Sequence, residues 1–511
     1  MSNVPTGWQA SCLSDLASAV GGGTPSKSEP RYWANGSIPW VSPKDMKTRL
    51  VIDSEDHVTE AALDRLSVVP PDSVLVVVRS GILSRTLPVA QTKVPITVNQ
   101  DMRAFVPHAG ISSSFLAWQL ISKEREILQA CSKDGTTVAS IEGPALAGFP
   151  LLIAPAAEQT RIVAKLEELL SDLDAGVAEL KAAQQKLARY RQSLLKAAVE
   201  GALTAEWRAS HPPAETGVQL LERILTERRT RWEARQLAKF QEQGKTPPKD
   251  WQKKYPEPVP PDTRDLPELP KGWVWASVDQ LSPDDLANGR SVPTADNGAK
   301  VLRLTSVRDG LIDLTASKCG AWTDDEARPF WVAEDDLLIV RGNGSLSLVG
   351  RAGLVPAVDE PVAYPDTLIR LRVLSSVVRP AWVAAMWNSA LVRNHIEGRA
   401  RTSAGIYKIS QPDIVTTAIP VPPLAEQSAA LAVLDALKTE VAGTASAIEH
   451  SLKQSAAQRQ NILRAAFSGQ LVPQEPSDEP ASVLLERIRA GREALARARK
   501  PRGRRVTEVG T

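Results

Sequence analysis

Residues 192–198 read QSLLKAA and residues 460–466 read QNILRAA, which places two versions of one segment 268 positions apart. Five further pairs of segments match in the same order at spacings of 262–268 residues: Gly7-Trp8 with Gly272-Trp273, 74–79 with 337–341, 115–118 with 382–385, Ala157-Glu158-Gln159 with Ala425-Glu426-Gln427, and 220–224 with 484–488. Solenoid repeats are only about 20–50 residues long. The spacing therefore indicates two domain-sized copies in one chain.

The end of each copy carries a heptad pattern that predicts a long helix. Apolar residues recur at the positions expected for helix pairing: Leu166, Leu173, Leu180, Leu187 and Leu194 in copy one, and Leu434, Val441, Ile448, Leu452 and Ile462 in copy two. Each helix could instead lie on its own globular domain. Two matching heptad helices in one chain favour pairing with each other, as an antiparallel coiled coil.

The first part of each copy combines short strands with short helices, which predicts an α/β (α+β) fold with two mixed α/β domains separated by the helix pair. Strands are expected at 38–41, 74–78, 301–307 and 337–340, and helices at 115–121 and 382–387. The predicted organisation is domain one at 1–155, helix at 156–204, charged helix and proline-rich linker at 205–265, domain two at 266–422, helix at 423–472, and basic tail at 473–511.

The overall charge does not indicate a partner, because 61 Lys and Arg oppose 59 Asp and Glu. Two local runs, 218–254 and 487–505, are strongly basic. Such runs suit a polyanion or form the solvated face of a helix. A duplicated, pseudo-twofold chain also suits DNA, whose backbone has local twofold symmetry, although enzyme halves duplicate as well.

The sequence contains no complete catalytic, cofactor-binding or metal-binding motif. The five histidines, His57, His108, His211, His395 and His450, are scattered without metal-ligand spacing. Cys12, Cys131 and Cys319 form no CxxC pair and suit a reducing cytosol. No adenine-methyltransferase Asn/Asp-Pro-Pro-aromatic motif and no complete phosphate-binding or nuclease motif occurs. We also expect no signal peptide and no membrane span.

The run Ile419 to Gln427, IPVPPLAEQ, followed by a heptad helix, resembles the conserved regions of type I restriction–modification DNA-specificity subunits. Residues 149–159 form a weaker first version, in which Ala154 and Ala156 replace the Pro422 and Leu424 of copy two. Residues 463–471 resemble the end of that family's helix, and 23–25, 38–40 and 337–342 resemble features of its target recognition domains. The resemblance covers nearly the whole chain.

This resemblance implies a non-catalytic, cytoplasmic subunit that recognises a bipartite target in double-stranded DNA. It implies two target recognition domains at opposite ends of the helix pair. The partners would be two methyltransferase (modification) subunits and ATP-driven restriction/translocase subunits, with no membrane. S-adenosylmethionine, ATP and Mg²⁺ would bind those partners, and no cofactor is expected in this chain.

Base reading requires Arg, Lys, Asn, Gln, Ser or Thr on loops that reach base edges or phosphates. The DNA-binding candidates are Ser42, Lys44, Arg79, Ser80, Arg85, Thr136 and Thr137 in copy one, and Arg303, Thr305, Arg308, Arg341, Asn343, Arg401, Thr402, Ser403 and Lys408 in copy two. Each of them could instead be a solvated or capping side chain. Trp8, Trp40 and Trp273 are expected in the core rather than as stacking platforms.

Two other functions remain open. One is a coiled-coil scaffold with two binding domains and no affinity for duplex DNA. The other is a single-chain restriction enzyme, which would transfer methyl groups or cleave DNA by itself.

Overall fold

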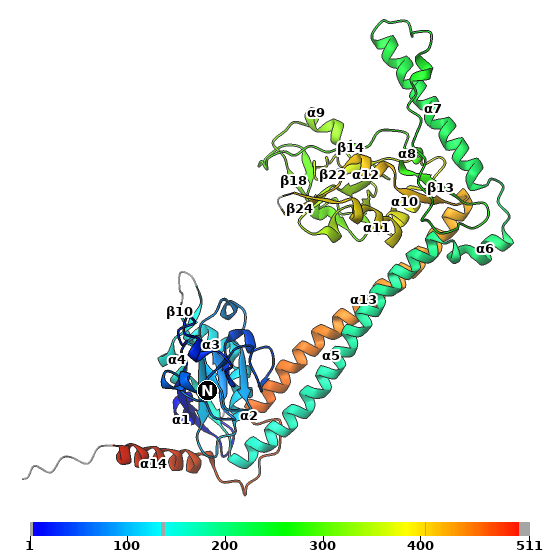
Figure 1. The fold of residues 1–511 in the computed structure, drawn as a ribbon. Coiled ribbons are helices and arrows are strands. Elements are labelled where there is room, and N and C mark those ends of the chain that lie inside the picture. The colour runs from blue at the N-terminus through cyan, green and yellow to red at the C-terminus, as the bar shows by residue number, and fades with distance from the viewer. Residues whose placement is uncertain (1–3, 134–137, 404, 500–511) are drawn as a thin grey trace, which may run out of the picture. The chain divides into compact units, whose positions relative to one another are not determined.

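The computed structural model describes residues 4–133, 138–403 and 405–499. It divides into two compact units, Met1–Lys181 with Glu449–Thr511, and Ala182–Ile448. Both boundaries fall inside long helices, so each unit holds one globular domain and a part of both helices (Figure 1).

The globular part of the first unit is built on a five-stranded mixed sheet in the order β2-β9-β6-β7-β4. Its central strand β6 (Val74–Val77) is fully buried and pairs antiparallel with β7 (Val89–Thr92) and β9 (Met102–Pro107). The edges are β2 (Ala17–Gly21) and β4 (Leu50–Val51), which is parallel to β7. The remaining elements are β1 (Gln9–Cys12), β3 (Ile38–Val41), β5 (His57–Val58), β8 (Thr97–Val98), β10 (Ser132–Lys133), β11 (Ser140–Ile141), β12 (Pro150–Ile153), α1 (Leu13–Leu16), α2 (Ser113–Ser122), α3 (Glu124–Cys131) and α4 (Gly143–Ala147).

The globular part of the second unit has a six-stranded sheet in the order β14-β22-β19-β21-β17-β16. Its buried central strand is β19 (Leu337–Val340), between β21 (Ala352–Leu354) and β22 (Leu368–Leu371). The other elements are β13 (Val274–Ser277), β14 (Ala287–Asn288), β15 (Lys300–Leu302), β16 (Val307–Arg308), β17 (Leu311–Ile312), β18 (Ser317–Cys319), β20 (Gly342–Asn343), β23 (Arg401–Ser403), β24 (Ile406–Lys408), β25 (Ala418–Val421), α6 (Ala205–Ser210), α7 (Gly217–Glu242), α8 (Val278–Leu281), α9 (Asp324–Ala327), α10 (Pro380–Trp387), α11 (Ala390–Arg399) and α12 (Gln411–Val415).

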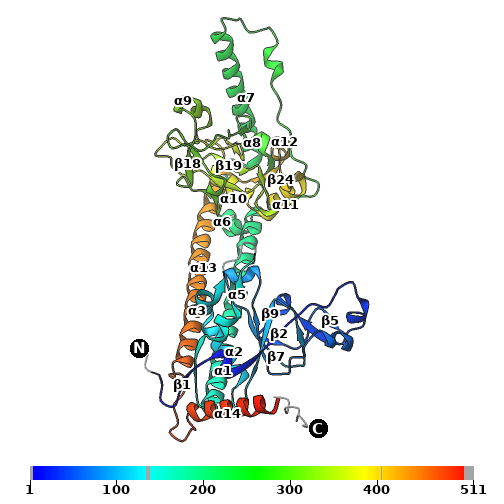
Figure 2. The ribbon, with the colours of Figure 1, turned by 90° about the vertical axis from the view of Figure 1, so that its left-hand side faces the viewer.

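Two helices of 44 residues each, α5 (Ala156–Val199) and α13 (Leu424–Phe467), pack against each other inside both units (Figures 1 and 2). In the first unit, Leu166 near the start of α5 shares a core with Ile462 near the end of α13. In the second unit, Val199 at the end of α5 shares a core with Leu434 near the start of α13. The helices are therefore antiparallel, as predicted.

The burial of the heptad residues varies along this helix pair. Leu166, Leu434, Val441, Ile448 and Ile462 are buried, whereas Leu173, Leu180, Leu187, Leu194 and Leu452 are half-buried. Val441 and Ile448 are buried although they belong to neither domain core, whereas Leu173 packs against the core of the first domain and is half-buried, so burial along the helix pair does not simply follow contact with a globular domain.

The repeated Ala-Glu-Gln motif has the same contacts in both copies. Trp8 Nε1 donates to Glu158 Oε1 at 3.0 Å, and Trp273 Nε1 donates to Glu426 Oε2 at 2.9 Å. The following glutamines cap a second helix in each copy: Gln159 Oε1 accepts from the amide of Ser112, at the N-cap of α2, and Gln427 Oε1 from the amide of Arg379, at the N-cap of α10, both at 2.8 Å. The duplicated sequence thus encodes a duplicated junction between helix and domain.

Some expectations from the sequence need correction. The strand expected at 301–307 ends at Leu302, because a 3-10 helix follows at Leu304–Ser306. In this turn the amide of Ser306 donates a hydrogen bond to the carbonyl of Arg303. The repeated segment 484–488 of the basic tail lies in a helix, α14 (Ala481–Arg499), and this does not alter the predicted tail. Trp8, Trp40 and Trp273 are buried, as expected.

The match of segment 74–79 with segment 337–341, which sets Arg79 opposite Arg341 at a spacing of 262 residues, is wrong by one residue. The amides of Val78 and Arg341 donate to the carbonyls of Asp101 and Thr367, both at 2.8 Å, in equivalent places beside the central strands. Val78 therefore corresponds to Arg341, and Arg79 to Gly342. Because successive side chains of a strand point to opposite faces, this slip puts the two arginines on different faces of their sheets.

We expect that replacing Gly22 with alanine lowers the free energy of unfolding by about 1–3 kcal/mol. A Cβ at Gly22 would lie 1.9 Å from the carbonyl oxygen of Asn99, so the backbone must move. Gly81 is the matched control, because a Cβ there meets nothing within 4 Å. Urea denaturation checks this result; equal midpoints for both variants would contradict the close approach.

Candidate nucleic-acid interface

A small hairpin sheet lies beyond the central strand of copy two. There, β20 pairs with β24 and β24 pairs with β23, which places Gly342 and Arg401 on either side of Lys408, and Asn343 and Thr402 on either side of Tyr407. This sheet holds or adjoins six of the nine candidates of copy two: Arg341, Asn343, Arg401, Thr402, Ser403 and Lys408. The fold thus collects side chains that are distant in sequence.

No acidic side chain in the described part of the chain neutralises the cations of this hairpin sheet. Arg401 and Lys408 are exposed and Arg341 is half-buried, and none of the three forms an ion pair within residues 4–133, 138–403 and 405–499. Asn343 Oδ1 accepts from the amide of Ser345 at 2.9 Å, which shapes the adjoining loop. For Ser403 the structure describes the backbone position only.

The other three candidates of copy two lie at an edge of the six-stranded sheet, around β16. Arg303 Nε donates to the carbonyl of Ser317 at 3.2 Å. Arg308 Nε donates to the carbonyl of Thr305 at 3.0 Å, and Arg308 Nη1 lies 3.5 Å from Asp313 Oδ2. The two arginine side chains already have partners, Thr305 contributes its backbone carbonyl, and none of the three joins the hairpin sheet.

Copy one has a corresponding hairpin. Arg79 forms an isolated bridge with Ser140, and β10 pairs antiparallel with β11. Arg79 Nε lies 3.3 Å from Asp101 Oδ1. The candidates Thr136 and Thr137 lie outside the described residues.

Three further candidates of copy one have structural partners. Ser42 is buried, and its hydroxyl donates to Asp45 Oδ2 at 2.9 Å, which caps a 3-10 turn. Lys44 Nζ lies 3.0 Å from Asp56 and 3.1 Å from Glu55, and its hydrogen bond to Asp56, followed by that to Glu55, raises the pKa of Lys44. Ser80 accepts from the amide of Ile82 at 3.4 Å.

Arg85 is exposed and has no side-chain partner among the described residues. Its assignment as a DNA contact stays a prediction.

Sequence reasoning missed two positions, Lys133 and Tyr407. Lys133 lies 268 residues before Arg401, which is the repeat spacing. The structure places both residues on the first strand of their hairpins. The duplication itself was therefore a signal that could have found Lys133. Tyr407 is marked only by the strand pairing that sets it opposite Asn343 and Thr402.

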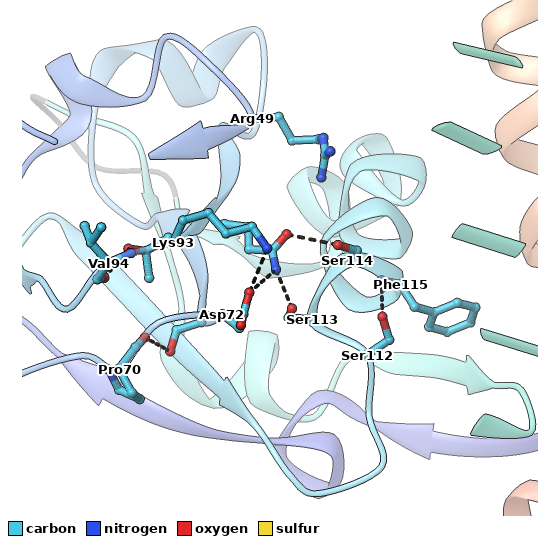
Figure 3. A network of polar contacts seen from close by, with 12 residues as sticks. Arg49, Pro70, Asp72, Lys93, Val94, Ser112, Ser113, Ser114 and Phe115 are labelled. Carbon is cyan, nitrogen blue, oxygen red and sulfur yellow. Dashed lines mark hydrogen bonds and ion pairs between the residues drawn. The ribbon is translucent and has the colours of Figure 1, made fainter. Parts of the chain in front are cut away.

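A polar network around the buried Gln91 connects β7 with α2 and with the residues before β6 (Figure 3). Gln91 on β7 donates to Asp72 Oδ1 at 3.1 Å and accepts from the hydroxyl of Ser114 on α2 at 3.0 Å. Lys93 Nζ donates to the same Asp72 oxygen at 2.8 Å. Because Gln91 is almost fully buried, these bonds satisfy groups that would otherwise be costly to bury. The network fixes the start of α2 against the sheet and is structural.

The basic run on α7 is compensated inside the chain. Five of its arginines have acidic partners: Arg223 with Glu215, Arg228 with Asp279, Arg229 with Glu233, Arg231 with Glu227, and Arg235 with Asp284. This run was expected either to bind a polyanion or to form the solvated face of a helix. The described contacts favour a solvated helix that docks on its neighbouring domain.

The described part of the chain gives little support for a metal site or a membrane span. No group of three or more His, Cys, Asp or Glu residues there could hold a metal ion. Every helix described is either too short or too polar to cross a bilayer.

Comparison with known proteins relates these features to one family. Residues 5–182 match the family model of the type I restriction modification DNA specificity domain. The EcoR124I/EcoR124II specificity subunit of Escherichia coli is 41% identical over 188 residues, which is 36% of this chain and 46% of that protein.

The EcoKI specificity subunit of Escherichia coli strain K12 is 25% identical over 96% of this chain and 97% of its own length. A solved structure that concerns complex assembly and conformational transition of the type I R-M system has the same fold. It has a TM-score of 0.61, 17% identity, and coverage of 92% of this chain and 99% of the other. Residues 5–182 thus match the family model of the type I specificity domain, and over nearly its whole length the chain, with its duplicated domains and paired antiparallel helices, is similar to type I restriction–modification DNA-specificity subunits.

Proposed function

We propose that this chain is the non-catalytic subunit that selects the DNA target of a type I restriction–modification enzyme. Each recognition domain contacts one half of a bipartite site in double-stranded DNA. Two methyltransferase subunits and the restriction/translocase subunits bind to the chain and carry S-adenosylmethionine, ATP and Mg²⁺. The complex acts in the cytoplasm.

One observation carries this proposal: the same hairpin recurs in both domains, and each hairpin displays cations beside hydroxyl side chains. Lys133 lies next to Ser132 in copy one, and Arg401 lies next to Thr402 in copy two. Cations and hydroxyls on a projecting element suit phosphates and base edges. Two such elements in one chain suit a target with two halves.

We expect the purified chain to transfer no methyl groups and to cleave no DNA. Together with its methyltransferase subunits it should direct adenine methylation to a single bipartite sequence. Methyl transfer is measured with labelled S-adenosylmethionine, and the modified adenines are mapped by sequencing. Methylation by the chain alone, with partner subunits excluded by mass spectrometry, would overturn the proposal, as would methylation of random sequences by the complex.

A further inference from the structure

The two hairpins occupy equivalent places but differ in the charges around them. In both copies the second hairpin strand leads into a short helix, α4 or α12, whose N-cap residues are Glu142 and Ser410. Beside the central strand, Asp101 and Thr367 accept equivalent backbone hydrogen bonds. At both positions, copy one has an acid where copy two has a neutral hydroxyl residue.

The acids of copy one face its cations. Arg79 Nε lies 3.3 Å from Asp101 Oδ1, and that oxygen is buried without a hydrogen-bond partner among the described residues. A buried carboxylate oxygen needs a compensating charge, so Asp101 retains Arg79. On the hairpin, Lys133 Nζ lies 3.9 Å from Glu142 Oε1. Contact with a phosphate would require each cation to leave or share its acid.

Among the residues that the structure describes, no acid competes for the corresponding cations of copy two. Arg401 takes the place of Lys133, but Ser410, in the place of Glu142, instead contacts Asp413. Asp366, the acid next to Thr367, accepts from the hydroxyl of Ser291 and pairs with none of the described cations. Arg401 and Lys408 are exposed and lack an ion pair within the described chain.

We propose that the two recognition domains share the electrostatic part of DNA binding unequally. The hairpin of copy two supplies the larger part of the phosphate contacts through Arg401 and Lys408. The hairpin of copy one is largely neutralised by Asp101 and Glu142, and it supplies the smaller part of these contacts. This inference rests on the proposed function and specifies how its two DNA-contacting surfaces differ.

The test is the salt dependence of binding by the full chain to a 40-base-pair duplex of arbitrary sequence. Each cation–phosphate contact contributes about 0.9 to the slope of log K against log[NaCl]. R401Q/K408Q should therefore reduce the slope by about 1.8, whereas R79Q/K133Q should reduce it by less than about 0.9.

Reciprocal variants separate charge masking from simple loss of cations. D101N/E142Q keeps Arg79 and Lys133 but removes their acids, so it should steepen the slope by about 1–2. S410E places an acid where copy one has Glu142, and it should reduce the slope by about 0.9 by masking Arg401. Asp366→Asn is the matched control, expected to leave the slope unchanged. Thermal melts establish that each variant is folded.

The outcomes distinguish the inference from the proposed function. If the wild-type chain binds no duplex at low salt, both fail. If it binds, but the two cation-removing variants reduce the slope equally, the unequal division is wrong. An unchanged slope for folded D101N/E142Q would also contradict it, because removing the acids would then have freed no cation.

Discussion

Replacing Glu426 with glutamine should lower the free energy of unfolding of the second unit by about 2–4 kcal/mol at pH 7. The carboxylate accepts from Thr204 Oγ1 at 2.7 Å, Arg208 Nε at 2.8 Å and Trp273 Nε1 at 2.9 Å. Its side chain is only 2% exposed, and that of Arg208 is 22% exposed. Glutamine keeps the shape but leaves the Arg208 guanidinium without its counter-charge. The partial exposure of Arg208 places this estimate below the range for a fully buried pair.

Replacing Glu158 with glutamine should instead raise the free energy of unfolding at pH 7. Glu158 is equally buried, but Trp8 is its only hydrogen-bond donor among the described residues, and it forms no ion pair there. At the repeat spacing of 268, Val472 and Pro476 stand where Thr204 and Arg208 support Glu426. Burial therefore raises the pKa of Glu158, and the bond from Trp8 offsets only part of this effect.

The pH dependence of the Glu158→Gln variant follows from the raised pKa of Glu158 in the folded state. A carboxyl whose folded pKa lies above its unfolded value does not destabilise the fold at low pH, where both states are protonated. It lowers stability as the pH rises from the unfolded value through the folded one. Glu158→Gln should therefore increase stability at pH 7 and lose this advantage near pH 4.

Hydrogen exchange measured by mass spectrometry on peptides from each unit would resolve both effects, because a chain of two units need not unfold in one step. Faster exchange around α6 and the start of α13 is expected for Glu426→Gln. If both glutamine variants changed their own units in the same direction at pH 7, the difference between the two junctions would be without energetic consequence.

Exchanging residues 266–422 for the corresponding domain of another specificity subunit should change one half of the recognised site completely and leave the other half unchanged. The second domain has its own cores, separate from that of the first unit. The exchange also keeps β13 with its partner β25, so that no strand pair is divided. The donor needs a tryptophan at the position of Trp273, because Glu426 accepts its indole N–H.

Sequencing of methylated adenines in cells that also express the methyltransferase subunits would read out both halves of the site. Specific and non-specific sites commonly differ by about 10³–10⁷ in affinity, so a changed half-site abolishes methylation of the original sequence. The reciprocal exchange of residues 1–155 is the matched control and should change the other half only. Alteration of both half-sites by one exchange would show that the domains do not read independently.

Local patterns in the sequence were sufficient for much of the architecture. The heptads at Leu166 to Leu194 predicted α5, because a helix places every third or fourth residue on one face whatever surrounds it. The repeated segments predicted that both copies share one fold, and β6 with β19 and α2 with α10 bear this out. By contrast, 301–307 was assigned to a strand from its apolar residues, and a turn at Leu304–Ser306 interrupts it.

The candidate site depended far more on tertiary structure. Residue types that suit DNA were visible in the sequence, but Ser42 and Arg401 looked equally suitable. Only the fold shows that Ser42 caps a turn and that Arg401 stands exposed on a hairpin, with no ion pair to any described residue. Helix periodicity and internal duplication are properties of the chain alone, so the sequence by itself determined them. Whether a charge is neutralised depends on residues such as Arg79 and Asp101, which are distant in sequence and meet only when strands pair, and this the tertiary structure alone decided.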